Sequence, residues 1–140
     1  MLENSENQPE ENETMEKIAG ENFTRWNETL LTEDPEKVAA LYAASSTFLP
    51  TMSGELKTGR LGATEYFKHF LEQKPNSEII QEKIQPLGDA GYVHSGRYDF
   101  EVGPEHNRKK VEARFTFIWQ KDDAGAWTII HHHSSIKPKG

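Results

Sequence analysis

The sequence predicts a single, cone-shaped α+β domain in which three N-terminal helices cover the concave face of a strongly curved antiparallel sheet. Two observations predict this class. Apolar residues recur at helical spacing in segments before residue 75, and four long segments rich in β-branched and aromatic residues follow, separated by short turns. Helices first and strands afterwards is the segregated arrangement of α+β folds.

The first two helices are predicted from apolar spacing and from a capping signal. The apolar stripe of the first helix, expected over about 14–32, consists of Met15, Ile18, Ala19, Phe23, Trp26 and Leu30. Asp34-Pro35 then supplies an N-cap and a proline at the first helical position of a second helix. Val38, Leu41 and Tyr42 are expected to form the buried stripe of that helix.

The remaining elements are one short strand, a third helix and an antiparallel meander. Thr47–Met52 is β-branched and aromatic and ends at Ser53-Gly54, which predicts a strand and a turn. A third helix is predicted by the aromatic positions of 66–71 and closes at Lys74-Pro75. The strands that follow are expected at 79–87, 92–102, 108–121 and 127–136, joined by glycine-containing turns.

A pocket is predicted from the alternation along the strand at 111–119. Its odd positions are all apolar, whereas Arg114, Thr116 and Ile118 mix on the other face. A strongly bent sheet with one helix-covered concave face produces this pattern and leaves a hollow inside the cone.

Charge and composition exclude several classes of function. The formal net charge is −7, and residues 1–16 hold six glutamates and no lysine or arginine, so the rest of the chain is nearly neutral and offers no basic stripe for nucleic acid. Residues 1–14 are almost purely polar and are expected to form a disordered acidic tail ahead of a domain at 15–138. No apolar run reaches the length of a membrane span and no basic, apolar leader is visible, which predicts a cytoplasmic protein without nucleic-acid or membrane partners.

Several segments, in order along the chain, resemble the association (hub) domain of calcium/calmodulin-dependent protein kinase II. The matching segments are Phe23-Thr-Arg-Trp-Asn, Asp34-Pro-Glu-Lys-Val-Ala-Ala-Leu-Tyr, Phe48-Leu-Pro, Tyr66-Phe-Lys-His-Phe-Leu, Arg114-Phe-Thr-Phe-Ile-Trp and Trp127-Thr-Ile-Ile-His-His-His-Ser-Ser. The resemblance covers about residues 15–138 and implies the nuclear transport factor 2-like fold, dimerisation and stacking into rings. Kinase signatures and a basic calmodulin-target helix are both absent, so the chain looks like the free-standing relatives found outside animals.

The resemblance also implies a ligand pocket, for which Arg97, Arg114, His131, His133 and Tyr66 are the candidates. Animal hubs carry several arginines there; Arg97 falls where one of them sits, and Arg114 lies three residues before another. A charged residue in mid-strand needs a partner or a wet cavity, so both arginines are either pocket residues or surface residues paired with a carboxylate. The carboxylates within reach are those of Asp99, Glu101 and Glu112.

Ser134 departs from the hub pattern, because the hub has an arginine directly after its His-x-His segment. Its absence removes one positive charge from the pocket. His131 and His133 share one face of the last strand and His132 the other, and two imidazoles without a nearby carboxylate make only half a metal site. No metal and no cofactor are therefore expected.

Two functions remain open at this stage. The leading hypothesis is a self-associating hub, forming a homodimer and a higher ring-like oligomer, whose cone holds a small polar or anionic ligand such as a carboxylate. Its assembly contact is expected on the outer face of the last strands, at Ile118, Ile130 and Ile136. The alternative is a small lyase, isomerase or cyclase that uses Asp99, Tyr42, Tyr66 or a histidine as acid and base.

Overall fold

The computed structural model describes the backbone of residues 2–140 and the side chains of residues 14–140. Its helices are α1 (Leu2–Leu31), α2 (Pro35–Ala39) and α3 (Gly59–Phe70), the last extended by a 3₁₀ turn at Leu71–Gln73. The strands are β1 (Tyr42–Leu49), β2 (Lys57–Thr58), β3 (Asn76–Pro86), β4 (Gly91–Val102), β5 (Lys109–Lys121) and β6 (Trp127–Ile136). Of the acidic tail predicted over 1–14, residues 1–13 fall outside the residues whose side chains are described.

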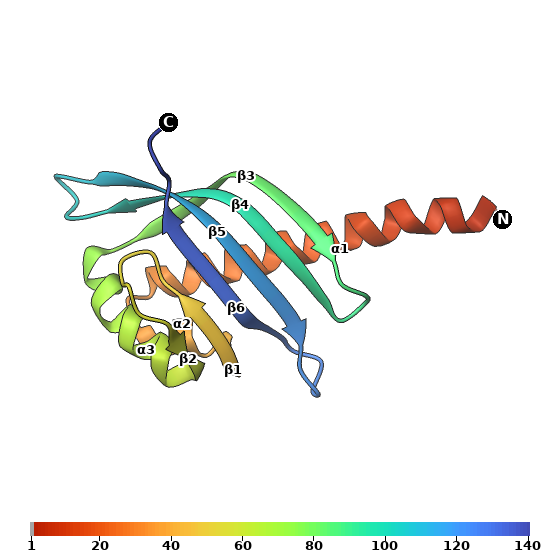
Figure 1. The fold of residues 1–140 in the computed structure, drawn as a ribbon, viewed down its shortest axis with the longest axis horizontal. Helices are drawn as coiled ribbons and strands as arrows, with labels where there is room; N and C mark the ends of the chain where they lie inside the picture. Colours follow the sequence, from red (N-terminus) through yellow and green to blue (C-terminus); the bar gives the residue numbers. More distant parts are fainter. Residues whose placement is uncertain (1) are drawn as a thin grey trace.

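The strands form one curved sheet in the order β2-β1-β6-β5-β4-β3. The meander predicted from the turns is confirmed, since β3, β4, β5 and β6 pair antiparallel with their chain neighbours. β1 pairs parallel with β6 and antiparallel with the two-residue β2, which the sequence did not indicate. Figure 1 shows α1 crossing one face of this sheet while α2 and α3 close its end beside β1 and β2. The predicted α+β cone is therefore confirmed.

The first helix packs on the sheet through the stripe that its spacing predicts. Met15, Ala19, Phe23, Trp26 and Leu30 are all buried, and the Trp26 ring stacks on that of Tyr98 at a centroid distance of 6.2 Å. Such a stripe repeats every three or four residues because one helical face meets the sheet. The largest apolar areas of the domain are thus buried between α1 and the concave face.

The prediction for Tyr42 is wrong: this residue begins β1 and does not belong to the second helix. The cap of α2 is as predicted, since the Asp34 side chain accepts a hydrogen bond from the Glu36 amide at 3.0 Å. α2 nevertheless ends at Ala39, and the Ile129 amide then donates to the carbonyl oxygen of Leu41 at 2.8 Å. Pairing with β6 satisfies this backbone better than one more helical turn, so tertiary contacts override the local spacing.

The bend of the sheet requires a glycine at position 96. Gly96 has a φ of 154° and pairs with Glu82, next to the irregular register of β3 between Ile79 and Gln81. A Cβ atom built on Gly96 would lie 1.9 Å from the carbonyl oxygen of Gln81, a backbone atom that cannot move aside as a side chain could. The close approach of the two strands at this bulge is therefore possible only without a side chain.

No helix among the described residues combines the length and the apolar composition that a membrane crossing needs.

The substitution Gly96→Ala is expected to lower the free energy of unfolding by about 2 kcal/mol or more, because the new methyl group meets rigid backbone. Gly20→Ala is the matched control: it adds a methyl group with nothing within 4 Å, on an exposed helical position. That variant is expected to be neutral or more stable by up to about 1 kcal/mol. Urea unfolding of both variants measures the difference, and equal effects would contradict the steric interpretation of Gly96.

Candidate functional site

The two faces of the sheet carry different residues, as the period-two geometry of strands requires. On the concave face, His94, Phe117, His132 and Phe48 lie in one row across β4, β5, β6 and β1, and all four are buried. The neighbouring positions of each strand therefore point to the outer, convex face. Any site of the protein has to be assigned to one of these faces.

The structure places four of the five predicted pocket residues on the outer face. Arg97 lies opposite Arg114 in the register of β4 and β5. In the next rows, His133 lies opposite Thr116, and His131 lies opposite Ile118. Tyr66 is the exception, because it projects from α3 into a cavity at the end of the cone. The set is thus divided between an outer surface and an inner cavity.

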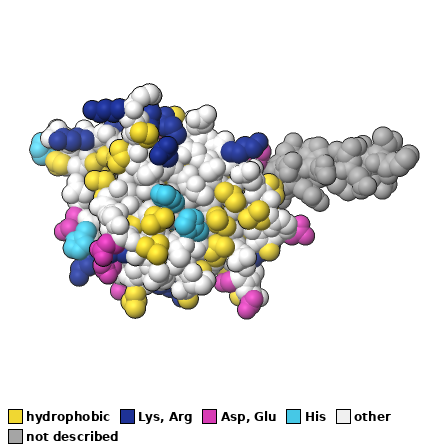
Figure 2. All heavy atoms as spheres, viewed as in Figure 1, with side chains coloured by type: hydrophobic (Ala, Val, Ile, Leu, Met, Phe, Trp, Pro, Cys, Tyr) yellow, Lys and Arg dark blue, Asp and Glu magenta, His cyan; other side chains and the backbone are white. Residues whose placement is uncertain are grey.

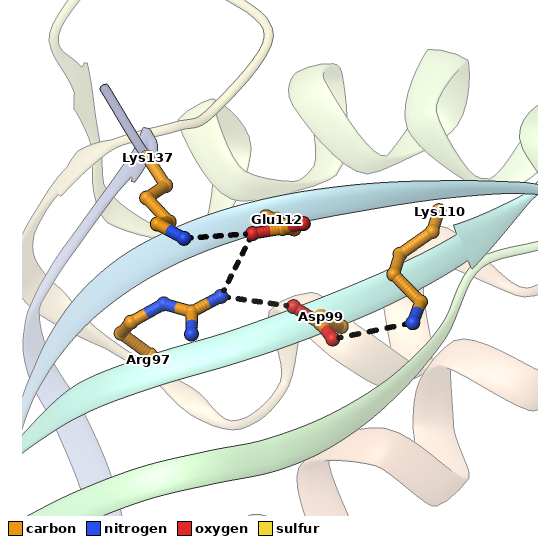
Figure 3. A network of polar contacts seen from close by, with 5 residues as sticks. All are labelled: Arg97, Asp99, Lys110, Glu112 and Lys137. Atoms are coloured by element: carbon orange, nitrogen blue, oxygen red, sulfur yellow. Dashed lines mark hydrogen bonds and ion pairs between the residues drawn. The ribbon is translucent and has the colours of Figure 1, made fainter. Parts of the chain in front are cut away.

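Arg97 is paired with carboxylates, which is the alternative that the sequence left open. Its guanidinium lies 3.3 Å from Asp99 and 3.3 Å from Glu112, and Figure 3 shows all three side chains on the same side of the sheet. Lys137 donates to Glu112 at 3.0 Å and Lys110 lies 4.0 Å from Asp99. Lys137 is the main reason that the pKa of Glu112 lies below its ordinary value. This cluster lies at the surface, on the outer face of the two strands.

The histidines of the outer face do not form a metal site. His131 shares a hydrogen bond of 2.7 Å with the Thr47 hydroxyl on β1, and partial burial, together with the neighbouring His133, lowers the pKa of His131. Within the part of the chain whose side chains are described, no group of three or more His, Asp, Glu or Cys residues is arranged to hold a metal ion.

The inner site is a cavity of about 560 Å³ between α3, the loop that follows β1 and the ends of β4 and β5. Its apolar walls are Met52, Tyr66, Phe70, Phe100, Val102 and Val111. The size and the largely apolar lining are those of a site for a small molecule. α3 supplies Tyr66 and Phe70, whose rings pack at a centroid distance of 5.4 Å, and their helical spacing places both on the sheet side of α3.

The charged residues of the cavity are at its rim and neutralise one another in part. Lys57 donates to Glu65 at 2.7 Å and lies 3.7 Å from Glu55. The hydrogen bond with Glu65 raises the pKa of Lys57 and lowers that of Glu65. Among the described lining residues there is no arginine. The prediction of a small carboxylate ligand depended on Arg97 and Arg114, and neither of these arginines lines the cavity.

His132 lies behind this cavity, in the core, and the sequence assigned it no role. Its ring is 1% exposed and is stacked between Phe117 at 4.0 Å and Phe48 at 4.7 Å. Burial holds the pKa of His132 well below its ordinary value, so the ring is neutral. Alternation along the strand puts His132 on the other face of the sheet from His131 and His133. This alternation is the sequence signal that could have indicated that His132 faces the core.

A chain of hydrogen bonds runs from the core through His132 towards the cavity. The Tyr42 hydroxyl lies 2.8 Å from Nδ1 of His132, and the Tyr98 hydroxyl lies 3.1 Å from Nε2. Tyr98 in turn donates to Ser134 at 2.6 Å, and the Ser134 hydroxyl bonds that of Thr51, a lining residue of the cavity. Burial raises the pKa of both tyrosines, which keeps their hydroxyls protonated.

The inner end of this chain has a fixed donor. The Trp26 indole can only donate, and it does so to the Tyr42 oxygen at 3.2 Å. Every group is satisfied when Tyr42 donates to Nδ1 of His132, Nε2 of His132 donates to the oxygen of Tyr98, and Tyr98 donates to Ser134. Either hydroxyl can donate in the last bond, between Ser134 and Thr51.

Tyr66 supplies a second hydroxyl to the cavity wall. Its oxygen accepts a hydrogen bond of 3.3 Å from the amide of Met52, the residue that follows Thr51. Burial raises the pKa of Tyr66 to about 12. Its own hydrogen has no acceptor within reach among the described residues. Two hydroxyl donors therefore lie close together on one wall.

The acid and base candidates of the enzyme hypothesis are divided between the two faces, the core and the cavity. Asp99 belongs to the outer-face cluster with Arg97. Tyr42 and His132 are buried in the core, where they bond each other. Tyr66 and one histidine, His69, line the cavity.

Comparisons with known proteins agree with the geometry of the fold. Residues 16–138 match the family model of the calcium/calmodulin dependent protein kinase II association domain. A solved structure from Xanthomonas campestris, described as such an association domain, is 38% identical with a TM-score of 0.83, over 89% of this chain and 88% of that chain. The hub homology domain from Chlamydamonas reinhardtii is 19% identical with a TM-score of 0.72, over 89% and 98% of the two chains.

A nuclear transport factor 2-like protein from Salmonella enterica shares the fold at 18% identity and a TM-score of 0.76, over 91% of this chain and 94% of that chain. No curated protein sequence matches the chain. The fold predicted from the resemblance is confirmed by these structures.

Stability is expected to fall as the pH drops below about 6.5, because the unfolded chain binds protons that folded His132 excludes. A histidine whose pKa is lowered by folding contributes fully to stability when the pH is above its pKa in the unfolded chain. This contribution is lost as the pH falls towards its pKa in the folded protein. His132→Gln keeps a hydrogen-bonding side chain but cannot titrate. This variant is expected to have a lower free energy of unfolding at neutral pH. It is also expected to reduce the slope of the free energy of unfolding against pH by up to about 1.4 kcal/mol per pH unit.

Urea unfolding at a fixed protein concentration, from about pH 5 to 7.5, measures this slope. His106→Gln, at an exposed position of the turn between β4 and β5, is the control for the loss of a surface histidine. A slope that is unchanged by His132→Gln would show that His132 does not carry the pH dependence.

Proposed function

Because this chain belongs to the calcium/calmodulin-dependent protein kinase II association-domain family, we propose that it acts as a self-associating hub that holds a small ligand in its cone. The observation that carries the proposal is the family match over residues 16–138. This match covers nearly the whole of the globular domain. A domain of this size has no room for a second catalytic module within the matched region. The proposal therefore assigns assembly and binding to this one domain.

The outer face of the sheet supports the assembly half of the proposal. Leu49, Val93 and Ile118 are half-buried there, in rows with His131 and His133 across β1, β4, β5 and β6. Figure 2 shows histidine and hydrophobic side chains gathered in the middle of this face, with lysines, arginines and carboxylates towards its margins. An apolar centre with a charged rim is the usual composition of a protein interface.

Of the three isoleucines expected at this contact, one lies elsewhere and one falls at a bulge. Ile118 is on the outer face as predicted. Ile130 falls at the irregularity of register between Ile129 and His131, and Ile136 pairs with the inward-facing Ala113 at the end of β6. The bulge shifts the alternation of β6 by one residue, which the sequence pattern did not reveal. We therefore centre the proposed contact on Ile118 and the two histidines.

The cavity supports the ligand half of the proposal. It is walled by apolar side chains, and the hydroxyl-bearing residues Thr51 and Tyr66 are among those that line it. Because the cavity and the proposed contact lie on opposite faces of the sheet, a ligand can be held while the copies remain assembled.

Native protein at about 20 µM is expected to elute as an oligomer, and Ile118→Asp is expected to lower its mass to that of a smaller species, because a carboxylate would be buried without a partner. Leu61→Asp is the control, since Leu61 is 87% exposed on α3, away from the sheet face. Size-exclusion chromatography with light scattering measures the mass, and circular dichroism checks the fold. A native monomer, or an unchanged mass for Ile118→Asp, would contradict the proposed assembly face.

A further inference from the structure

We infer that the cavity binds an uncharged small molecule with an apolar body and a single hydrogen-bond acceptor, of the class of aryl or alicyclic ketones. The ketone oxygen would lie against the hydroxyls of Thr51 and Tyr66, and the apolar body against the walls of the cavity. This inference rests on the proposed ligand-binding function and names the class of ligand.

The walls account for the apolar body. Phe70, Phe100, Val102 and Val111 come from α3, β4 and β5 and present ring and methyl surfaces to the hollow. The Phe70 ring meets that of Phe100 edge to face at 5.3 Å, which leaves both rings fixed. A rigid apolar wall favours a rigid apolar ligand, because neither partner loses much conformational freedom on binding.

The charges at the rim argue against an anion. Two carboxylates, Glu55 and Glu65, share the single ammonium group of Lys57, so this part of the rim carries an excess negative charge. The Lys57 side chain is only 11% exposed and already donates to Glu65 at 2.7 Å. An incoming carboxylate would have to displace that partner and approach Glu55, and both steps are unfavourable.

The hydroxyl groups account for the acceptor. The Thr51 hydroxyl lines the cavity and bonds that of Ser134, and either of the two oxygens can donate in that bond. When Ser134 donates, the hydrogen of Thr51 can be given to a ligand. The Tyr66 oxygen is occupied by the Met52 amide, which leaves the Tyr66 hydrogen free as well. Because Met52 follows Thr51 in the chain, both hydrogens are offered on the same wall. A carbonyl oxygen has two lone pairs and can accept both.

Four probes of matched size separate the possible ligand classes. Acetophenone has the acceptor, ethylbenzene has none, benzoate is an anion and 1-phenylethylamine is a cation. Saturation-transfer difference NMR on the full chain gives an apparent dissociation constant for each. Acetophenone is expected to bind about ten-fold more tightly than ethylbenzene, the effect of one or two hydrogen bonds, and more tightly than either ion.

Two variants test the assigned donors. Thr51→Val and Tyr66→Phe each remove one hydroxyl with little change of shape. Each is expected to weaken the binding of acetophenone about five-fold and to leave the binding of ethylbenzene unchanged. Thr47→Val is the matched control, because its hydroxyl bonds His131 on the outer face. Thermal melts verify that the variants are folded, and Tyr66→Phe decides the question if Thr51→Val is unstable.

Each result has one interpretation. Tightest binding of benzoate or 1-phenylethylamine, or equal binding of acetophenone to native protein and both hydroxyl variants, overturns the ligand class but leaves a ligand-binding cavity. If none of the four probes binds, the inference and the ligand half of the proposed function both fail, whereas the assembly half is judged by the mass of the native protein alone.

Discussion

A neutral histidine enclosed by aromatic rings is the feature around which the inner face is organised. The imidazole of His132 has two nitrogens, and each one needs a hydrogen-bond partner because no water reaches a ring that is 1% exposed. The partners come from β1 and β4, and the Tyr42 hydroxyl is in turn held by α1 through Trp26. Three elements must therefore meet β6 in one register for this group to be satisfied, which makes the arrangement specific as well as stable.

The same period of two that buries His132 also divides the molecule into two working surfaces. Its neighbours His131 and His133 are turned to the convex face, where self-association is proposed, while Ser134 continues the inner chain to the cavity. Curvature separates the two faces further, because it opens the hollow on one side and spreads the side chains on the other. Gly96 permits that curvature by removing the side chain where β3 and β4 approach most closely.

Much of the fold could be predicted from the sequence because its signals are local. Turn glycines delimit β3 to β6, and the capping by Asp34 and Pro35 marks α2 correctly. Tyr42 was misplaced because helical spacing cannot report pairing with a strand that lies almost ninety residues later. Likewise, the two mid-strand arginines were recognised as charges in need of compensation, but the choice between a cavity and a carboxylate depends on which face they occupy. The alternation of β4 and β5 puts both arginines on the outer face, whereas the bulge in β6 shifts the residues of that strand and left no clear trace in composition.

Position 134 connects the departure from the hub pattern with the chemistry of the cavity. The resemblance predicts an arginine there, which would place a fixed positive charge on the inner face and favour an anionic ligand. Serine has no charge, but its hydroxyl both accepts and donates, so it extends the hydrogen-bond chain from Tyr98 to Thr51. An arginine could only donate and would reverse the polarity of this step. One residue thus accounts for both the lost cation and the gained neutral donor, which is why the cavity suits an uncharged acceptor.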